Sequence, residues 1–227
     1  MNRNLAVRYV IREISGIVGM GVALFWSAGT FAWWPAWAAL GVMVAWIAAT
    51  AVVVLRLNPD LLAERLGPRQ GAKRWDAAIV SILGLVQLVR YIVAGLDRRH
   101  GWTGGNPMIA QMVALVTCIL GYALFTWATA ANRFFSQIMR VQTERGHAVV
   151  SGGPYRWVRH PAYLGAILHE LAVPVLLASW WSGIAGATAA GLLLLRTVLE
   201  DRALQVELSG YAEYACRVRY RLVPGVW

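Results

Sequence analysis

Long apolar segments separated by short polar stretches dominate this chain of 227 residues. A helix needs about 20 apolar residues to cross roughly 30 Å of hydrocarbon. Four segments of that length lie in the N-terminal part, and two shorter ones follow a polar stretch. The six predicted membrane segments are residues 14–33, 36–55, 77–96, 108–130, 164–181 and 183–199. We therefore expect an all-α, polytopic membrane bundle that forms a single domain over residues 1–227.

The ends of this pattern need two further interpretations. The first apolar segment exceeds the 7–15 apolar residues of a signal peptide, so we interpret it as a retained membrane anchor. The last two segments are short and should form a hairpin that turns near residues 180–183, either spanning fully or re-entering. Between the second and third segments, Leu61, Leu62 and Leu66 beside Glu64 and Arg65 predict a short helix on the inner surface.

Composition supports a membrane protein and excludes two other classes. Hydrophobic residues make up 59% of the chain and charged residues 14%, whereas a soluble domain is roughly 45–50% apolar and about 25% charged. An ordinary soluble globule and a disordered chain are therefore excluded. The net charge of +10 would suggest a nucleic-acid partner in a soluble domain. In an apolar chain it indicates loops that face an anionic membrane surface, so we expect membrane lipids and no nucleic acid.

The distribution of basic residues predicts the orientation. Eighteen lysine and arginine residues fall on one predicted side, and only Arg98 and Arg99 fall on the other. The positive-inside rule then places both termini in the cytoplasm. Two charges lie within predicted spans, Arg90 and Glu170. Their predicted depths differ by roughly 12 Å in a core of ~30 Å, so we expect Arg90 to snorkel outward. Glu170 either faces an acceptor channel or bonds to a neighbouring helix.

Two polar stretches hold the candidate chemistry. In the first, Gly152–Pro154 force a turn, and His160-Pro161 opens an apolar helix whose start offers free backbone N–H groups. By composition alone, this stretch is equally typical of a basic, aromatic loop that contacts headgroups. In the second stretch, Arg196 and Glu200 are four residues apart on one helix face, which favours an i,i+4 ion pair or a carboxylate positioned for a ligand. The four histidines show no zinc-binding spacing, so we expect no metal.

The motifs in these stretches resemble a known family. Residues 153–165, Gly-Pro-Tyr-Arg-x-Val-Arg-His-Pro-x-Tyr-x-Gly, look like the signature of membrane methyltransferases that include isoprenylcysteine carboxyl methyltransferases and phospholipid N-methyltransferases. The acidic pair Glu200-Asp201 before Leu204, then Gly-Tyr-x-x-Tyr at 210–214 and a basic tail, resemble the same family's C-terminal motif. The ending Pro224–Trp227 resembles a bacterial branch. The resemblance covers about residues 131–227, whereas residues 1–130 resemble the family only as four apolar spans.

The resemblance implies an S-adenosylmethionine-dependent methyltransferase, with cofactor-binding and catalytic residues in 131–227. The implied acceptor is lipid-borne, isoprenylcysteine-like or phospholipid-like, at the cytoplasmic face of a bacterial inner membrane. The implied cofactor-binding residues are Tyr155, Arg159, His160, Pro161, Tyr163, Leu164, Gly165, Glu200 and Asp201. The candidate catalytic residues are Glu170, Arg196 and Tyr214. Asp201 stands where the family more often has Glu, which leaves open which acid of the pair contacts the cofactor.

Each part of such a cofactor suits a residue type in these motifs. Its carboxylate would bind Arg159 and the helix start after Pro161, and its ribose hydroxyls would bind a carboxylate such as Glu200. Its sulfonium could lie against the aromatic face of Tyr163. Because the methyl group is already activated, the enzyme would mainly align the two reactants.

Two other functions compete with this hypothesis. Some membrane sterol and steroid reductases that use NADPH have a similar Arg-His-Pro-x-Tyr stretch, and Arg217, Arg219 and Arg221 could bind a 2′-phosphate. The acidic pair and the Gly-Tyr-x-x-Tyr motif fit the methyltransferase pattern better. A membrane scaffold or transporter is the third alternative, but the polar residues gather on one side rather than along a transmembrane path. The pattern leaves the oligomeric state open.

Overall fold

The computed structural model describes residues 3–58, 60–66 and 71–227, and no strand occurs within these ranges. The long helices are α1 (Arg3–Ala28), α2 (Trp34–Val52), α4 (Arg74–His100), α5 (Met108–Ala131), α6 (Pro161–Leu176) and α7 (Trp180–Glu207). Two short helices, α3 (Asp60–Leu66) and α8 (Tyr211–Arg217), lie between and after them. The remaining turns are a π-helical segment, Val53–Leu57, and two 3₁₀ turns, Thr143–Arg145 and Gly153–Arg156.

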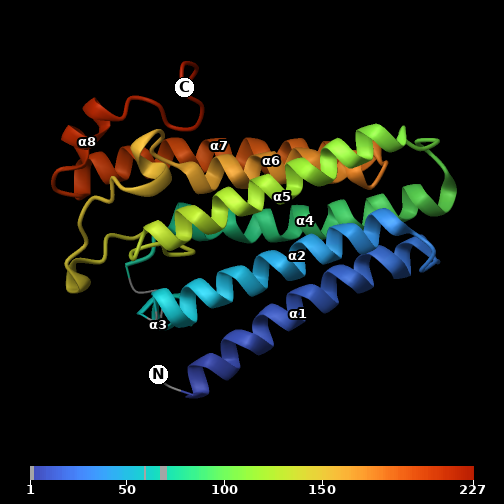
Figure 1. Ribbon diagram of the computed structural model, residues 1–227, viewed down its shortest axis with the longest axis horizontal. Coiled ribbons are helices and arrows are strands. Elements are labelled where there is room, and N and C mark those ends of the chain that lie inside the picture. Colours follow the sequence, from blue (N-terminus) through green and yellow to red (C-terminus); the bar gives the residue numbers. More distant parts are fainter. Residues whose placement is uncertain (1–2, 59, 67–70) are drawn as a thin grey trace.

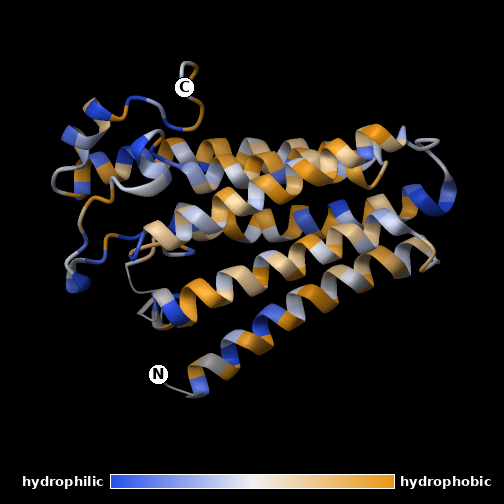
Figure 2. Ribbon diagram, viewed as in Figure 1, coloured by the Kyte–Doolittle hydropathy of each residue, from blue (hydrophilic) through white to orange (hydrophobic). Residues whose placement is uncertain are grey.

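The six long helices run alternately up and down, and both described ends of the chain lie at the same end of the bundle (Figure 1). We call this the polar end, because α3, α8 and the segment 132–160 all gather there (Figure 1). Colouring by hydropathy shows apolar residues along the bundle and hydrophilic residues concentrated at the polar end, with a smaller group at the far end of α4 (Figure 2). The fold is therefore the all-α membrane bundle that the sequence predicts.

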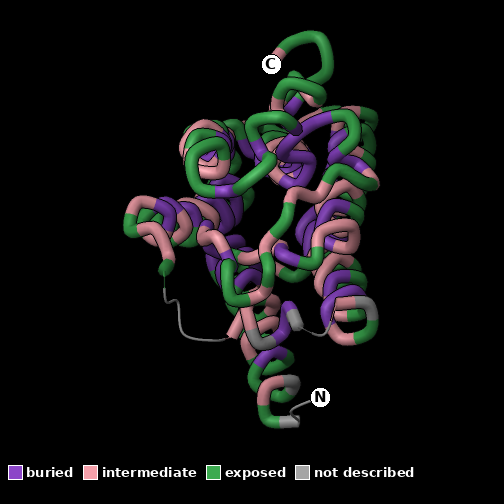
Figure 3. The backbone as a smooth tube through the Cα atoms, turned by 90° about the vertical axis from the view of Figure 1, so that its left-hand side faces the viewer, coloured by how far each residue is buried: buried purple, intermediate pink, exposed green. Residues whose placement is uncertain are grey.

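The helices pack as a closed ring. Helix α1 packs against α2 and α4, α4 against α7, α7 against α6, α6 against α5, and α5 against α2. Seen from the polar end, buried segments line the interior while exposed ones face outward (Figure 3). Many of the outward residues are large and apolar, such as Ile109, Leu120 and Ile184. An apolar exterior of this kind requires lipid around it, so the chain is an integral membrane protein.

The predicted hairpin is present, but its turn and helix lengths differ from the prediction. Within the described residues, five helices are long and apolar enough to cross a membrane, α7 among them, whereas α6 has only 16 residues. The turn lies at 177–179 rather than 180–183, because Ser179 caps α7 by accepting a hydrogen bond from the Ser182 N–H at 3.2 Å. Pro174 lies inside α6 near its end, where its missing N–H weakens the helix.

The prediction that Arg90 snorkels outward is wrong. Arg90 is only 1% exposed and forms an ion pair with Glu170 in the interior. Gln87 also donates to Glu170 at 2.7 Å. The predicted depths fail because both helices are longer than the apolar segments suggested. Helix α6 begins at Pro161 and α4 continues to His100, so at 1.5 Å per residue each charge lies about 14–15 Å from its helix end, near mid-membrane.

Close backbone contacts hold α5, α6 and α7 together. A Cβ atom added to Gly121 of α5 would lie 2.6 Å from the Gly165 carbonyl oxygen of α6. Similarly, a Cβ on Gly186 of α7 would lie 2.6 Å from the Glu170 carbonyl oxygen. Small residues at such contacts allow membrane helices to approach closely. The packing fixes α6, and with it the residues at its N-terminus, against both neighbours.

Candidate active site

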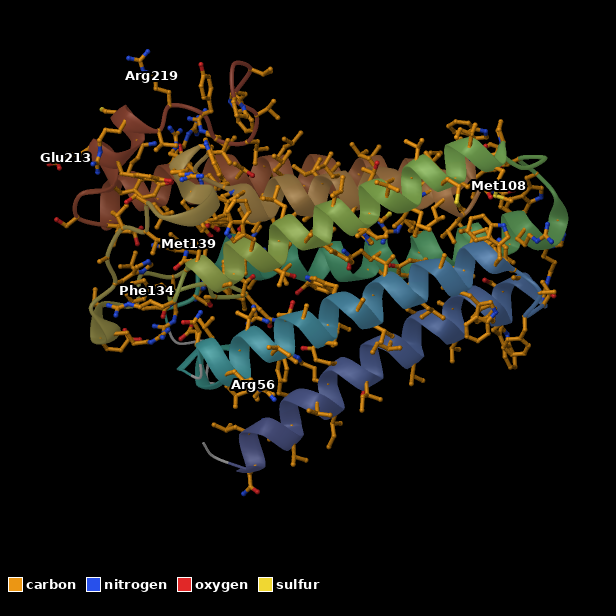
Figure 4. The ribbon with its side chains drawn as sticks, in the orientation of Figure 1. Arg56, Met108, Phe134, Met139, Glu213 and Arg219 are labelled. Carbon is orange, nitrogen blue, oxygen red and sulfur yellow. The ribbon has the colours of Figure 1, made fainter. Side chains whose placement is uncertain are left out.

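A cavity of about 480 Å³ opens inside the polar end of the bundle. One part of its wall comes from the segment 132–160 and from α6, α7 and α8, and the other part comes from α1, α2, α3 and α4. Pockets for small molecules usually measure about 300–1,000 Å³ and combine apolar walls with a few polar groups. Phe134 and Met139 line the cavity and lie on the loop at the polar end (Figure 4).

His160 lies at the N-terminal cap of α6, where Pro161 occupies the first helical position. The carbonyl of His160 accepts hydrogen bonds from the backbone N–H groups of Tyr163 and Leu164 at 3.1 and 3.2 Å. Its own N–H donates to the Arg221 carbonyl at 2.9 Å, and the Arg159 N–H donates to the Tyr220 carbonyl at 3.0 Å. These two bonds hold the C-terminal tail against the residues that precede α6. Both His160 and Arg159 line the cavity.

The two adjacent acids of α7 have different surroundings. Asp201 is completely buried and does not line the cavity. Its carboxylate accepts hydrogen bonds from Arg159 at 2.8 and 3.1 Å, from Arg221 at 2.9 Å and from the Tyr211 hydroxyl at 3.1 Å. The His160 Nε2 atom is 3.3 Å from the same carboxylate. Asp201 therefore connects α7 to the residues that precede α6, to α8 and to the C-terminal tail. Its role in the site is structural.

Glu200 is the acid of the pair that lines the cavity. Its side chain is 21% exposed, and one carboxylate oxygen accepts a hydrogen bond from the Tyr163 hydroxyl at 2.5 Å. The other oxygen lies 3.9 Å from His160 Nδ1. The rings of His160 and Tyr163 stack with centroids 5.7 Å apart. These three side chains form one polar, aromatic wall that faces the cavity.

Most of the N–H donors of Arg159 bind groups of the protein. Its Nε and Nη2 atoms bind Asp201, and Nη1 donates to the carbonyls of Val218 and Arg219 at 2.9 and 3.0 Å. A third carbonyl, that of Ala215, lies 3.4 Å from Nη1. Although Arg159 lines the cavity, its guanidinium holds the C-terminal segment in place. The expected contact between this guanidinium and a ligand carboxylate stays a prediction, and it would have to use the second N–H of Nη2.

Arg196 also lines the cavity, but its ion pair is not the one that helical spacing favours. It binds Asp76 of α4 with two hydrogen bonds of 2.6 and 2.9 Å and donates to the Gln137 carbonyl at 2.8 Å. Asp76, which the sequence did not single out, also accepts the Met139 N–H at 2.6 Å. Arg196 thus joins α7 to α4 and to the cavity loop, while Glu200 remains available.

Tyr155 and Tyr214 line the cavity, and the contact between them connects the loop before α6 to α8. The Tyr214 hydroxyl donates to the Tyr155 carbonyl at 2.6 Å, and Tyr214 packs edge-on to Tyr211 with centroids 5.5 Å apart. Burial raises the pKa of each of these three tyrosines above its ordinary value. They therefore stay protonated at neutral pH and do not act as bases.

The remaining predicted residues lie away from the cavity surface. Pro161 and Leu164 belong to the first turn of α6 but do not line the cavity, and Gly165 faces Gly121 of α5. Glu170 lies deeper, in its ion pair with Arg90. These residues shape the helix that carries His160 and Tyr163. Their direct contact with a ligand has no support in the geometry.

Sequence reasoning missed a second wall of the cavity, on the N-terminal helices. Trp46 and Thr50 of α2, Leu83 and Gln87 of α4, and Arg65 of α3 all line it. It also missed His147, which stacks on Phe134 with centroids 4.5 Å apart. Trp46 and Thr50 are four residues apart, so an i,i+4 pair of polar groups within an apolar span was the available signal.

The sequence is similar to a known protein family and to several methyltransferases. The profile of the isoprenylcysteine carboxyl methyltransferase (ICMT) family matches residues 112–206. Protein-S-isoprenylcysteine O-methyltransferase A of Arabidopsis thaliana is 26% identical over 142 residues, which cover 61% of this chain and 68% of that protein. A probable protein-S-isoprenylcysteine O-methyltransferase of Oryza sativa subsp. indica is 28% identical over 183 residues, covering 77% and 93% of the two chains.

The human protein-S-isoprenylcysteine O-methyltransferase is 28% identical over 114 residues, or 47% of this chain and 37% of that protein. The family match includes His160, Glu200 and Asp201 and ends before α8. It starts within α5, so the N-terminal wall of the cavity lies outside it. The matches favour methyl transfer and do not favour the reductase hypothesis.

Proposed function

We propose that the chain transfers a methyl group from S-adenosylmethionine to a lipid-borne carboxylate of the isoprenylcysteine type, because residues 112–206 match the model of the isoprenylcysteine carboxyl methyltransferase family. One observation carries this proposal: the wall of Glu200, His160 and Tyr163 continues, within a single cavity, into the apolar interior of a membrane bundle. A soluble donor and a lipidic acceptor would need such a cavity in order to meet.

The cavity wall suits an adenosyl methyl donor. The free carboxylate oxygen of Glu200 can accept hydrogen bonds from ribose hydroxyls. Val149, Leu204 and Leu208 offer an apolar surface for a base, and the ring of Tyr163 offers an aromatic face to a sulfonium. Most donors of Arg159 are engaged with Asp201 and with backbone carbonyls, so the donor's carboxylate would bind mainly to other groups than this guanidinium.

The proposed reaction needs alignment more than proton transfer. When bound, the donor supplies an activated methyl group, whose bond to sulfur breaks as a new bond to the acceptor oxygen forms, leaving the electron pair on sulfur. A carboxylate acceptor carries no proton to remove, so no general base is required. Glu200 and Tyr163 would orient the donor. Arg196 and Asp76 would position the loop that closes the cavity, and Tyr214 would act in the same way through Tyr155.

The proposal places the reaction at the cytoplasmic face. The polar end carries α8 and the basic tail, with Arg217, Arg219 and Arg221, and basic segments favour the inside of the membrane. Both termini would then be cytoplasmic, and the membrane would be a bacterial inner membrane. The acceptor would enter from the inner leaflet, between helices. A phospholipid amine remains the second acceptor to be tested.

The test is calorimetry on the detergent-purified chain with S-adenosylmethionine, S-adenosylhomocysteine and NADPH. We expect micromolar binding of the first two, no binding of NADPH, and at least a tenfold loss of affinity in Glu200→Gln. The matched control is Glu213→Gln, because Glu213 is exposed on α8 and points away from the bundle (Figure 4). Binding of NADPH without binding of S-adenosylmethionine would refute the proposal. Equal affinity of Glu200→Gln and Glu213→Gln for S-adenosylmethionine would also refute it.

The acceptor is tested separately by methyl transfer. With the protein and S-adenosylmethionine, N-acetyl-S-farnesylcysteine should become a base-labile methyl ester, whereas phosphatidylethanolamine should remain unmethylated. The reverse result would replace the carboxylate acceptor by an amine while leaving the methyl donor in place.

A further inference from the structure

The N-terminal wall of the cavity contains three polar atoms that have no hydrogen-bond partner among the described residues. Thr50 is only 3% exposed, yet its hydroxyl makes no hydrogen bond. The same is true of the buried indole Nε1 of Trp46, one turn earlier on α2, and of the buried Nε of Arg65 on α3. All three residues line the cavity. Buried polar groups are rarely left without a partner, because an unpaired buried donor loses its hydrogen bonds to water without replacement.

Thr50 differs from the other helical threonines in the part of the chain that the structure describes. Thr117, Thr126, Thr129, Thr188 and Thr197 each donate to the backbone carbonyl four residues earlier, at 2.8–3.0 Å. That bond is the usual choice for a threonine in a membrane helix. Thr50 could make it to Trp46 but does not, so its hydroxyl is free for another acceptor.

The local backbone of α2 supports this arrangement. Directly after Thr50, the helix widens into the π-helical segment Val53–Leu57, and such segments occur frequently at functional sites. On the other side, the ring of Trp46 stacks on Tyr122 with centroids 4.3 Å apart and an interplanar angle of 16°. The orientation of the indole is therefore fixed by packing, with its N–H left unbound.

Arg65 is half-buried and differs in its pairing from the buried arginines. Arg90, Arg159 and Arg196 each pair with a carboxylate, namely Glu170, Asp201 and Asp76. Among the described residues, no carboxylate pairs with Arg65. Its guanidinium hydrogen-bonds to the Tyr9 side chain, while its Nε atom has no partner. Glu13 lies nearby but is already bound by Arg12 at 2.5 Å. Burial lowers the pKa of Arg65 from its ordinary value, as expected for a cation without a full counter-charge.

We propose that Arg65, Thr50 and Trp46 form an acceptor subsite that binds an anionic oxygen group, a carboxylate or a phosphate, of the lipid-borne substrate. The three free groups are all hydrogen-bond donors, and one carries a positive charge, which suits an anion. The apolar residues Ile47, Val80 and Leu83 line the same cavity and suit the attached lipid. The inference rests on the proposed function and assigns acceptor recognition to helices outside the family match.

The test measures acceptor binding without the methyl donor, so that it does not depend on turnover. Calorimetry compares N-acetyl-S-farnesylcysteine with its carboxamide, which has the same lipid but no charge. We expect the wild type to bind the acid about tenfold more tightly, and Arg65→Gln and Thr50→Val to lose most of that preference. Thr117→Val is the matched control, because the Thr117 hydroxyl is bound within its own helix and does not line the cavity.

The outcomes separate this inference from the proposed function. Equal binding of acid and carboxamide by the wild type, or an unchanged preference in Thr50→Val, would overturn the subsite even if S-adenosylmethionine binds. Loss of methyl-donor binding with the acid preference intact would overturn the function instead. A parallel titration with vesicles of phosphatidylethanolamine distinguishes the source of the anion: binding that requires Arg65 there would identify a phosphate. Thr50→Val is nearly isosteric, so it remains informative if Arg65→Gln does not fold.

Discussion

Arg90 of α4 and Glu170 of α6 form an ion pair that is almost completely shielded, with side-chain exposures of 1% and 3%. Gln87 adds a hydrogen bond to Glu170, and the Tyr91 hydroxyl accepts one from Arg90 at 2.8 Å. Neither charged side chain lines the cavity. The pair joins α4 and α6, the two helices that flank α7 in the ring, so its main effect is on the stability of the bundle.

Removing one partner of this pair should destabilise the protein strongly. Glu170→Leu leaves the Arg90 guanidinium uncompensated, and breaking a buried pair typically costs about 3–5 kcal/mol. We expect a clear drop in the thermal unfolding temperature in detergent. The double variant Arg90→Met/Glu170→Leu should recover most of that loss, because no unpaired charge remains. A double variant as unstable as the single one would contradict this account.

Asp201→Asn should loosen the C-terminal segment. The carboxylate binds Arg159, Arg221 and Tyr211. An asparagine amide has only one acceptor oxygen and no negative charge, so it cannot replace these bonds or balance the two arginines. Limited proteolysis should then cleave around α8 and the tail several times faster than in the wild type. Binding of S-adenosylmethionine should weaken as a consequence. Glu200→Gln provides the contrast: weaker binding with wild-type resistance to protease. Equal protease resistance in both variants would contradict the structural role of Asp201.

Gly121→Ala tests the contact between α5 and α6. The new methyl group would lie 2.6 Å from the Gly165 carbonyl, so the helices must separate, at a cost of about 1–3 kcal/mol. Because α6 carries His160 and Tyr163, ligand affinity should fall together with the unfolding temperature. Gly41→Ala on α2 is the control, since nothing lies within 4 Å of its added Cβ. An effect of equal size at both positions would argue against the close-packing explanation.

His147 should make the stability depend on pH. Burial, followed by the charges of Arg145 and Arg140, lowers its pKa below the ordinary value. Its Nδ1 atom accepts the Gln142 N–H at 3.2 Å, which fits a neutral ring. A lowered folded-state pKa means that the unfolded chain takes up the proton more readily, so stability should fall as the pH drops below about 6.5.

The measurement is the unfolding temperature of the wild type and of His147→Gln between pH 7.5 and 5. The difference between the two proteins should shrink or reverse towards pH 5, because glutamine does not titrate. A pH-independent difference would show that His147 is not responsible.

The sequence by itself determined the helical architecture and the end at which the chemistry gathers. Apolar segments of about 20 residues, the His160-Pro161 helix start and the acids at 200–201 are local patterns, and local patterns set which residues form helices and which side they share. The short helix around Leu61 and Leu62 was also predictable, and its leucines pack against Tyr9 and Val54.

Only the tertiary structure decided which charges pair and which groups remain free. Asp76 rather than Glu200 binds Arg196, Glu170 binds Arg90, and Glu200 rather than Asp201 faces the cavity. These choices depend on the depth and rotation of helices that are 42 to 120 residues apart in sequence, and small errors in helix ends shift a side chain by several ångströms. The N-terminal wall with Thr50 and Arg65 likewise depends on how distant helices pack, which local sequence patterns do not determine.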